Sequence, residues 1–161
     1  MEMNDMNMEG LGLDAISTRV RARLKARREL LDIKQQTLGL LLPDPPKQWF
    51  IGRIELGEIR LPSARLVQLA HILRVPTAWL LGVDEYTTIT DDDPYLNIHA
   101  TAQMMLGPQY EQLVGALTED EAATEVVLKS VVTKRIENEG VNYGSTSAPL
   151  MGEQPRTSIS P

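Results

Sequence analysis

The chain has 161 residues, of which 42% are hydrophobic and 24% charged, a composition typical of a globular protein. It contains no cysteine, which excludes disulfides, thiolate zinc sites and thiol nucleophiles, and its two histidines show no metal-ligand spacing. No apolar run approaches the roughly 20 residues of a membrane-spanning helix, and the acidic N-terminus lacks the features of a signal peptide. We therefore expect a cytoplasmic protein with no membrane segment, no metal and no cofactor.

The net charge of -6 is spread unevenly along the chain. Residues 17–82 carry twelve arginine and lysine side chains against five carboxylates, a net charge of +7. Residues 1–16 contribute -4 and residues 83–161 contribute -9. A basic segment joined to an acidic one is typical of a phosphate-facing module attached to a part that does not touch nucleic acid. A basic face alone is more often just a solvated surface. Whether this segment binds nucleic acid therefore has to be judged from the motifs within it.

Two short helices are predicted at the start of the basic segment, after a flexible N-terminus over residues 1–15. The first helix has apolar residues at the four- and seven-residue spacings of one face and arginines on its other faces. This apolar stripe consists of Ile16, Val20, Leu24 and Leu31. The second helix begins near Lys34 and ends at Pro43, with three leucines turned inward, Leu38, Leu41 and Leu42.

Three further short helices complete the predicted core. Asp44 occupies an N-cap position and Pro45 the first helical position, so a third helix is expected from about Pro45 to Gly57. A fourth follows Pro62 and Ser63, and a fifth covers residues 77–81 before Gly82. The inward-facing residues of the third and fourth helices are predicted to be Ile51, Ile54, Leu66, Leu69, Ala70 and Leu73.

Three stretches in this segment carry a family resemblance. They are Leu31-Asp32-Ile33-Lys34-Gln35, Ile51-Gly52-Arg53-Ile54-Glu55-Leu56-Gly57, and Leu69-Ala70 followed by Leu73, Val75-Pro76 and Trp79-Leu80-Leu81-Gly82. In this order the segment resembles the Cro/CI repressor family, also called the Xre family, most closely the lambdoid phage repressors. The resemblance implies an all-α, five-helix lambda-repressor-like DNA-binding domain over residues 16–82. The chain departs from the family in an extra turn on the first helix and a longer, proline-rich turn at residues 42–46.

The resemblance also implies which side chains meet the bases. In such proteins the third helix lies in the major groove and its N-terminal residues contact base edges. Gln48 and Arg53 are then the expected readers, because Gln pairs with adenine and Arg donates two hydrogen bonds to guanine. Trp49 is assigned to the same group, where it either contacts a thymine methyl or sugar edge or packs its ring against the long turn.

A second set of side chains is expected at the DNA backbone. Gln35 resembles the family glutamine that bonds a phosphate and braces the next helix. The other expected phosphate contacts lie beside the third helix or in the loop behind it, and they are Lys34, Lys47, Arg60 and Arg65. Arg23 and Glu55 match a family pair that forms an internal ion pair. The remaining arginines of the first helix are expected to form a solvated face, from which Arg21 or Arg28 could reach a distal phosphate.

The acidic segment is predicted to consist of a linker over residues 83–93 and a helical oligomerisation segment over residues 94–139. Asp93 is expected to cap a helix that starts at Pro94, and Gly107-Pro108 interrupts it. A capping box at residues 118–121 predicts a helix over residues 119–138. Its apolar face either packs onto neighbouring helices or forms a subunit interface through Val126, Val127, Val131 and Ile136. Residues 140–161, rich in Gly, Ser, Thr and Pro, are predicted to be disordered.

These features favour a transcriptional regulator, a phage- or prophage-type repressor that binds double-stranded operator DNA as a homodimer. The alternative is the antitoxin of a toxin–antitoxin pair, in which the acidic half binds a protein partner, the toxin, and the basic half represses the operon. A third hypothesis is that the chain is a self-cleaving repressor of the serine–lysine type. The residues after Gly82 are too few for its β-rich peptidase domain, so we expect no enzyme activity.

Overall fold

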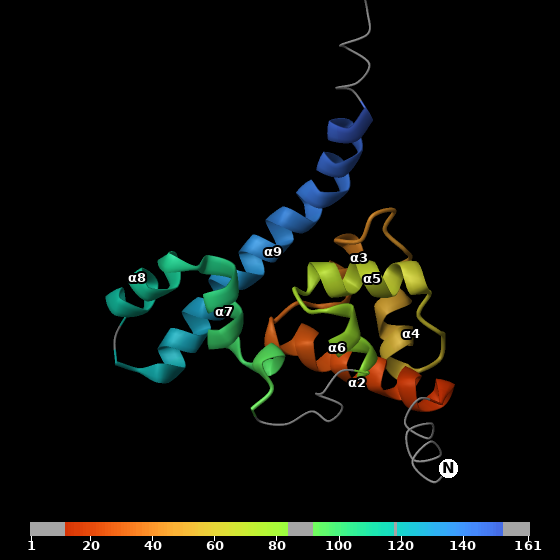
Figure 1. Ribbon diagram of the computed structural model, residues 1–161, viewed down its shortest axis with the longest axis horizontal. Coiled ribbons are helices and arrows are strands. Elements are labelled where there is room, and N and C mark those ends of the chain that lie inside the picture. Colours follow the sequence, from red (N-terminus) through yellow and green to blue (C-terminus); the bar gives the residue numbers. More distant parts are fainter. Residues whose placement is uncertain (1–11, 84–91, 118, 153–161) are drawn as a thin grey trace, which may run out of the picture.

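The computed structural model describes residues 12–83, 92–117 and 119–152, and every regular element in these ranges is a helix. Five helices of the basic segment pack together, and the helices of the acidic segment lie beside them (Figure 1). The elements are α2 (Leu13–Leu30), α3 (Gln35–Leu40), α4 (Phe50–Leu56), α5 (Ser63–Ile72), α6 (Thr77–Leu81), the 3-10 turn η1 (Pro94–Leu96), α7 (Ile98–Leu106), α8 (Pro108–Ala116) and α9 (Glu121–Gly152). The all-α fold class predicted from the sequence is confirmed.

The first described helix, α2, begins earlier than predicted. Residues 13–15 were expected to be flexible but form its first turn, while residues 1–11 lie outside the described part of the chain. The helix ends at Leu30, and Asp32 then adopts a left-handed backbone conformation with φ 56°. The Ile33 amide donates to the Arg28 carbonyl at 3.1 Å, which closes the end of the helix. This reversal directs the chain into α3.

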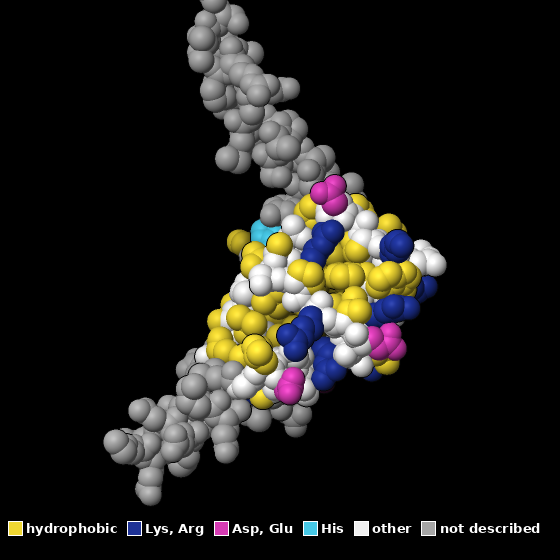
Figure 2. Space-filling view, turned by 90° about the vertical axis from the view of Figure 1, so that its right-hand side faces the viewer, with side chains coloured by type: hydrophobic (Ala, Val, Ile, Leu, Met, Phe, Trp, Pro, Cys, Tyr) yellow, Lys and Arg dark blue, Asp and Glu magenta, His cyan; other side chains and the backbone are white. Residues whose placement is uncertain are grey.

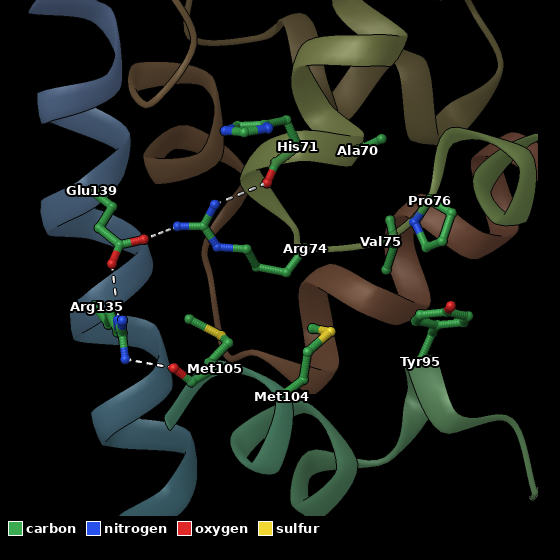
Figure 3. Close-up of a pocket in the computed structure, with 10 residues that line it drawn as sticks. All are labelled: Ala70, His71, Arg74, Val75, Pro76, Tyr95, Met104, Met105, Arg135 and Glu139. Carbon is green, nitrogen blue, oxygen red and sulfur yellow. Dashed lines mark hydrogen bonds and ion pairs between the residues drawn. The ribbon is translucent and has the colours of Figure 1, made fainter. Parts of the chain in front are cut away.

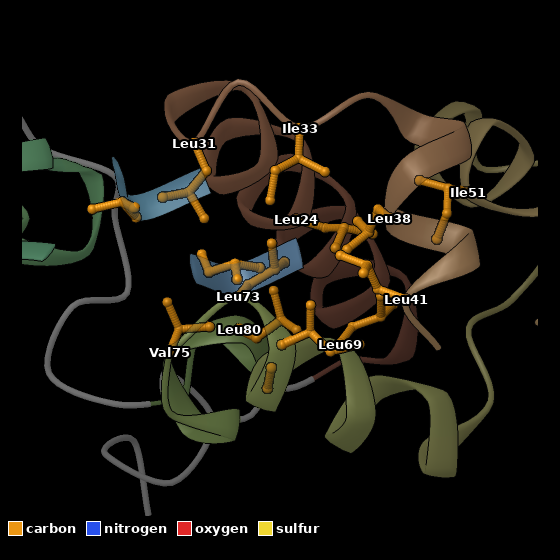
Figure 4. Close-up of a cluster of buried hydrophobic side chains, with 14 of the residues drawn as sticks. Leu24, Leu31, Ile33, Leu38, Leu41, Ile51, Leu69, Leu73, Val75 and Leu80 are labelled. Atoms are coloured by element: carbon orange, nitrogen blue, oxygen red, sulfur yellow. The ribbon is translucent and has the colours of Figure 1, made fainter. Parts of the chain in front are cut away.

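The five helices of the basic segment surround one apolar core (Figure 4). Leu24, Leu38, Leu69 and Leu73 are completely buried, and each fully buried leucine contributes roughly 2 kcal/mol relative to an exposed one. The inward-facing residues predicted for the second, third and fourth helices are all buried except Leu66, which is half-buried. The apolar periodicity of the sequence therefore identified this core.

Three arginines of α2 are buried, which agrees with the internal position expected of Arg23 and corrects the solvated face predicted for Arg27 and Arg28. Arg23, Arg27 and Arg28 expose 1%, 0% and 9% of their surface. Arg23 and Arg27 lie next to the apolar stripe of Val20 and Leu24 on the helix, so they turn into the molecule with it. Arg23 donates to the Trp79 carbonyl and its guanidinium lies 5.0 Å from the centroid of the indole ring.

Arg27 joins the basic segment to the acidic one. Its Nε donates to the Leu73 carbonyl at 2.9 Å, and its Nη1 donates to the Tyr95 carbonyl and the Thr101 hydroxyl, both at 2.6 Å. Burial lowers the pKa of the Arg27 guanidinium to about 10, against the opposing effects of Asp93 and Tyr95. The group therefore stays charged at neutral pH, and its hydrogen bonds hold α2 to the segment after the linker.

The start of the acidic segment is capped as predicted. Asp93 is buried, accepts from the Tyr95 amide at 2.9 Å, and also accepts from the indole Nε1 of Trp79 at 2.8 Å. Only the short turn η1 follows it, however, and α7 starts separately after Asn97, whose side chain caps the Ala100 amide. Gly107 and Pro108 end α7 and begin α8, as expected. Most of the predicted linker, residues 84–91, lies outside the described residues.

The long C-terminal helix, α9, differs from the prediction at both ends. The Asp120 carboxylate caps it by accepting from the Ala122 and Ala123 amides, while Thr118, the predicted cap, lies outside the described residues. The helix continues to Gly152, so the expected disorder is wrong for residues 140–152. Residues 153–161 lie outside the described part.

The inner face of α9 contributes Leu128, Val132 and Ile136 to the same apolar cluster as the five-helix core. Its Thr133 hydroxyl donates to the Leu31 carbonyl at the end of α2. Ile136 is 1% exposed, so its assignment to a subunit interface is wrong, because a neighbour in the same chain already covers it. Val127 and Val131 are half-buried, and only Val126, 67% exposed, remains fully open among the four predicted residues.

Within the described ranges, none of the helices combines the length and apolar character needed to cross a bilayer.

Candidate nucleic-acid interface

The proline-rich turn between α3 and α4 delays the start of α4. The helix begins at Phe50, not near Pro45. Asp44 adopts a left-handed conformation with φ 47° and cannot act as the predicted N-cap. Pro45 precedes another proline, and a residue before proline is driven out of the helical region, so the first turn can form only after Pro46. The Phe50 amide donates to the Lys47 carbonyl at 2.9 Å, which forms the turn that starts the helix.

Arg65 of α5 holds this turn in place. Its Nη1 donates to the Pro43 carbonyl, and its Nη2 donates to the Asp44 carbonyl at 2.7 Å. Nη1 also donates to the Gln68 side chain at 3.2 Å. The sequence assigned Arg65 to a DNA phosphate. The structure instead directs its guanidinium at two consecutive backbone carbonyls, so its role is to fix the course of the turn that leads into α4.

Two of the three predicted base readers form a stack on the exposed side of α4. The Arg53 guanidinium lies 4.5 Å from the centroid of the Trp49 ring, and Trp49 is 44% exposed. A cation over an indole face is attracted to it, so the ring restricts where the guanidinium can point. Glu58 lies 3.5 Å from Arg53 Nε, with both side chains about half exposed, and such an exposed ion pair is weak.

Trp49 therefore contacts Arg53, and its exposed part remains open to the solvent. Gln48 and Lys47 are exposed immediately before the helix, next to Trp49 in the chain. The structure thus brings a planar cation, an aromatic edge and an amide to one end of α4. All three are side chains that recognise base edges or bases in nucleic acids.

A buried polar cluster fixes α4 against α3. The Glu55 carboxylate accepts from Arg28 Nε at 2.6 Å and Nη2 at 3.0 Å, and from Gln35 Nε2 at 2.8 Å. The Glu55 side chain is only 4% exposed. Gln35 also lies against Gly52, where a Cβ atom would come within 3.1 Å of its Oε1. The bracing expected of Gln35 is confirmed, while the predicted Arg23–Glu55 pair is wrong, because Arg28 takes that place.

The remaining predicted phosphate contacts are exposed. Lys34 precedes α3, Lys47 precedes α4, and Arg60 follows α4, each with its side chain open to solvent. Figure 2 looks onto the side of the molecule that holds α4 and α5, where basic side chains are set among apolar ones. Their positions at the flanks of α4 suit contacts to phosphates on either side of a groove.

The sequence offered Arg21 as a residue that could reach a distal phosphate, but did not predict its contact with the end of α4. Its guanidinium covers Gly57, the left-handed residue (φ 79°) that ends α4, so closely that a Cβ there would lie 1.5 Å from Nη1. Arg21 Nη2 also donates to the Thr18 hydroxyl at 3.1 Å. A cation at a helix C-terminus is favourable. No sequence signal indicates this contact, since it depends on how the start of α2 crosses the end of α4.

Comparison with known proteins identifies no relative of this chain. No family model, curated protein or solved structure matches the chain. The assignment of a function therefore depends on the geometry of the site. Among the described residues no group of His, Cys, Asp and Glu side chains has the arrangement of a metal site.

Proposed function

We propose that this chain is a sequence-specific DNA-binding regulator of transcription that inserts α4 into the major groove. The observation that carries the proposal is the Trp49–Arg53 stack on the exposed side of α4. The stack stands on a helix whose angle to α3 is fixed by the Gln35–Glu55–Arg28 cluster. A side chain held in one orientation before binding loses less conformational entropy when it meets a base.

In this proposal Arg53 exchanges its exposed partner Glu58 for the O6 and N7 atoms of a guanine. The Trp49 ring supports the guanidinium plane and presents its edge to the neighbouring base or sugar. Gln48, one residue earlier, reads an adenine. Lys34, Lys47 and Arg60 neutralise phosphates at the flanks, which makes the affinity fall steeply with salt. The site of action is the cytoplasm, where a phage- or prophage-type repressor meets its operator.

We further propose that the protein binds as a homodimer. One short α4 offers few base contacts, and two copies related by a twofold axis read two half-sites about 34 Å apart. Val126 is the only member of the predicted association set that stays fully exposed, so α9 meets its partner on the Val126 side. Val126→Asp is therefore expected to lower the molar mass in light scattering from dimer to monomer, with the unfolding midpoint unchanged.

The test of the DNA proposal is selection from a pool of random duplexes long enough for two such half-sites, followed by fluorescence anisotropy. The enriched duplex should bind about a thousandfold more tightly than a scrambled one. Arg53→Ala is expected to weaken the enriched duplex about tenfold to a hundredfold and to relax the choice of one base pair. Glu58→Gln is the matched control and should leave the preferred sequence unchanged.

Failure to enrich any sequence would refute base reading by α4. Equal losses on enriched and scrambled DNA for Arg53→Ala would reassign Arg53 to phosphate binding. If no sequence is enriched, the antitoxin hypothesis is favoured. The next measurement is then whether the acidic half captures a protein partner.

A further inference from the structure

A cavity of about 500 Å³ lies between α5 of the basic segment and α7 and α9 of the acidic segment (Figure 3). Its size is within the range of sites that hold small molecules. Tyr95, Met104 and Met105 form much of its apolar wall. Met104 is 56% exposed, and the flexible thioether of methionine adapts to ligands of different shape.

One side of the cavity is basic. Arg74 and Arg135 approach a single carboxylate, that of Glu139, with Arg135 Nε at 2.9 Å (Figure 3). Arg135 Nη1 also donates to the Met105 carbonyl at 2.6 Å, and Arg74 Nη1 to the His71 carbonyl at 3.4 Å. Two guanidiniums against one carboxylate leave a net positive charge. Each guanidinium has five N–H donors, and among the described residues these contacts use two from each.

The backbone at Arg74 fixes where its side chain starts. Arg74 follows the end of α5 and has φ 59°, a left-handed conformation that glycine adopts with less strain. The Val75 amide donates to the Ala70 carbonyl at 3.0 Å, so this conformation closes the end of α5 in the usual way. It places Arg74 in the lining of the cavity, paired with Glu139.

We propose that this cavity binds a small organic anion. Its apolar body lies against Tyr95, Met104 and Met105, and its carboxylate, sulfonate or phosphate group pairs with Arg74 and Arg135. Glu139 holds both guanidiniums toward the cavity and competes with the ligand for them. The proposal does not depend on the DNA-binding function, because none of these residues belongs to the α4 surface.

The test uses two fluorescent probes with the same ring system and the full chain. One is 8-anilinonaphthalene-1-sulfonate, an anion, and the other is N-phenyl-1-naphthylamine, its uncharged parent. The anion is expected to bind one to one and about tenfold more tightly than the neutral probe. Arg74→Gly should remove this preference and leave binding of the neutral probe unchanged. Its urea midpoint should stay close to that of the wild type, because glycine suits the backbone at this position.

The Glu139→Gln variant is expected to gain affinity, a result that misfolding cannot produce. Removing the competing carboxylate should strengthen binding of the anionic probe several-fold. Lys134→Ala is the matched control, because Lys134 lines a different cavity of about 540 Å³ on α9 and should leave the anion affinity unchanged. Anion binding that follows Lys134 and ignores Arg74 would overturn the proposal, as would weaker binding in Glu139→Gln.

Discussion

Replacing Arg65 with methionine tests the role of the turn between α3 and α4. Methionine keeps the apolar stem of the side chain and removes the guanidinium that donates to the Pro43 and Asp44 carbonyls. Asp44 is exposed, so water replaces the donor to its carbonyl, whereas Pro43 is half-buried and is harder to satisfy. The loss then amounts to about one net hydrogen bond from a charged donor, or about 2 kcal/mol of unfolding free energy.

The same change should loosen the entry into α4. Asp44 holds a left-handed conformation that costs free energy, and the Arg65 guanidinium donates to its carbonyl. With the turn released, α4 samples several orientations and the competent one becomes a smaller fraction of the population. We expect the affinity for the enriched duplex to fall about tenfold, which corresponds to about 1.4 kcal/mol.

Urea unfolding and anisotropy at several salt concentrations measure both effects, with Lys47→Ala as the control. Arg65→Met should lower the unfolding free energy and the affinity while the dependence of affinity on salt stays unchanged. Lys47→Ala should leave stability unchanged and reduce the salt slope by about one. If Arg65→Met instead keeps full stability and reduces the salt slope by one, Arg65 is a phosphate contact and the reasoning from the turn is wrong.

Three further outcomes concern stability and are measured by urea unfolding. Arg28→Met should destabilise the protein by about 3 kcal/mol, because it leaves the Glu55 carboxylate buried without its cation, and adding Glu55→Gln should restore part of the loss. Leu128→Ala should cost about 3 kcal/mol and shift a single cooperative transition, whereas a separate early transition would show that α9 folds independently. Arg135 and Arg74 hold the pKa of Glu139 below 4.5, so the stability that its charge contributes is complete above pH 4.5 and disappears as the pH falls further. Accordingly, any difference between wild type and Glu139→Gln at pH 7 should shrink as the pH falls below 4.5, and a constant difference would contradict this account.

The sequence predicted the five helices and their apolar core because both depend on local periodicity. Leucine and isoleucine at three- and four-residue spacings lie on one face of a helix, and that face turns toward the core. The burial of Leu24, Leu69 and Leu73 agrees with this pattern. The start of α4 was misplaced because Pro45 was treated as a first helical residue. The restriction that Pro46 places on Pro45 could have been read from the sequence, and it accounts for the delay.

The roles of the arginines could not be predicted in the same way. An arginine beside an apolar stripe is usually solvated, and only tertiary contacts show that Arg27 and Arg28 turn inward. Arg23 and Arg28 lie five residues apart on α2, and which of them meets Glu55 depends on how α2 crosses α4. The same holds for Arg65, whose acceptors are backbone carbonyls that carry no signal in the sequence.

The cavity lined by Arg74 and Arg135 could not be found from the sequence either. Its residues come from α5 and the segment after it, η1, α7 and α9, and no motif connects them; Arg74 and Glu139 alone lie 65 positions apart. The one local hint is an arginine where a helix end favours glycine, and it becomes visible only with the backbone conformation.

The contact between Thr133 and Leu31 spans 102 positions of the chain and closes the end of α2 with a residue of α9. Synthesis on the ribosome proceeds from the N-terminus, so α2 to α6 emerge well before the helix that completes their core. Until then, the surface that later receives Leu128, Val132 and Ile136 is open to water and to other chains. A nascent chain that stalls before α9 would therefore expose an apolar face to other chains. The protein is thus most prone to aggregation before its last helix has been synthesised.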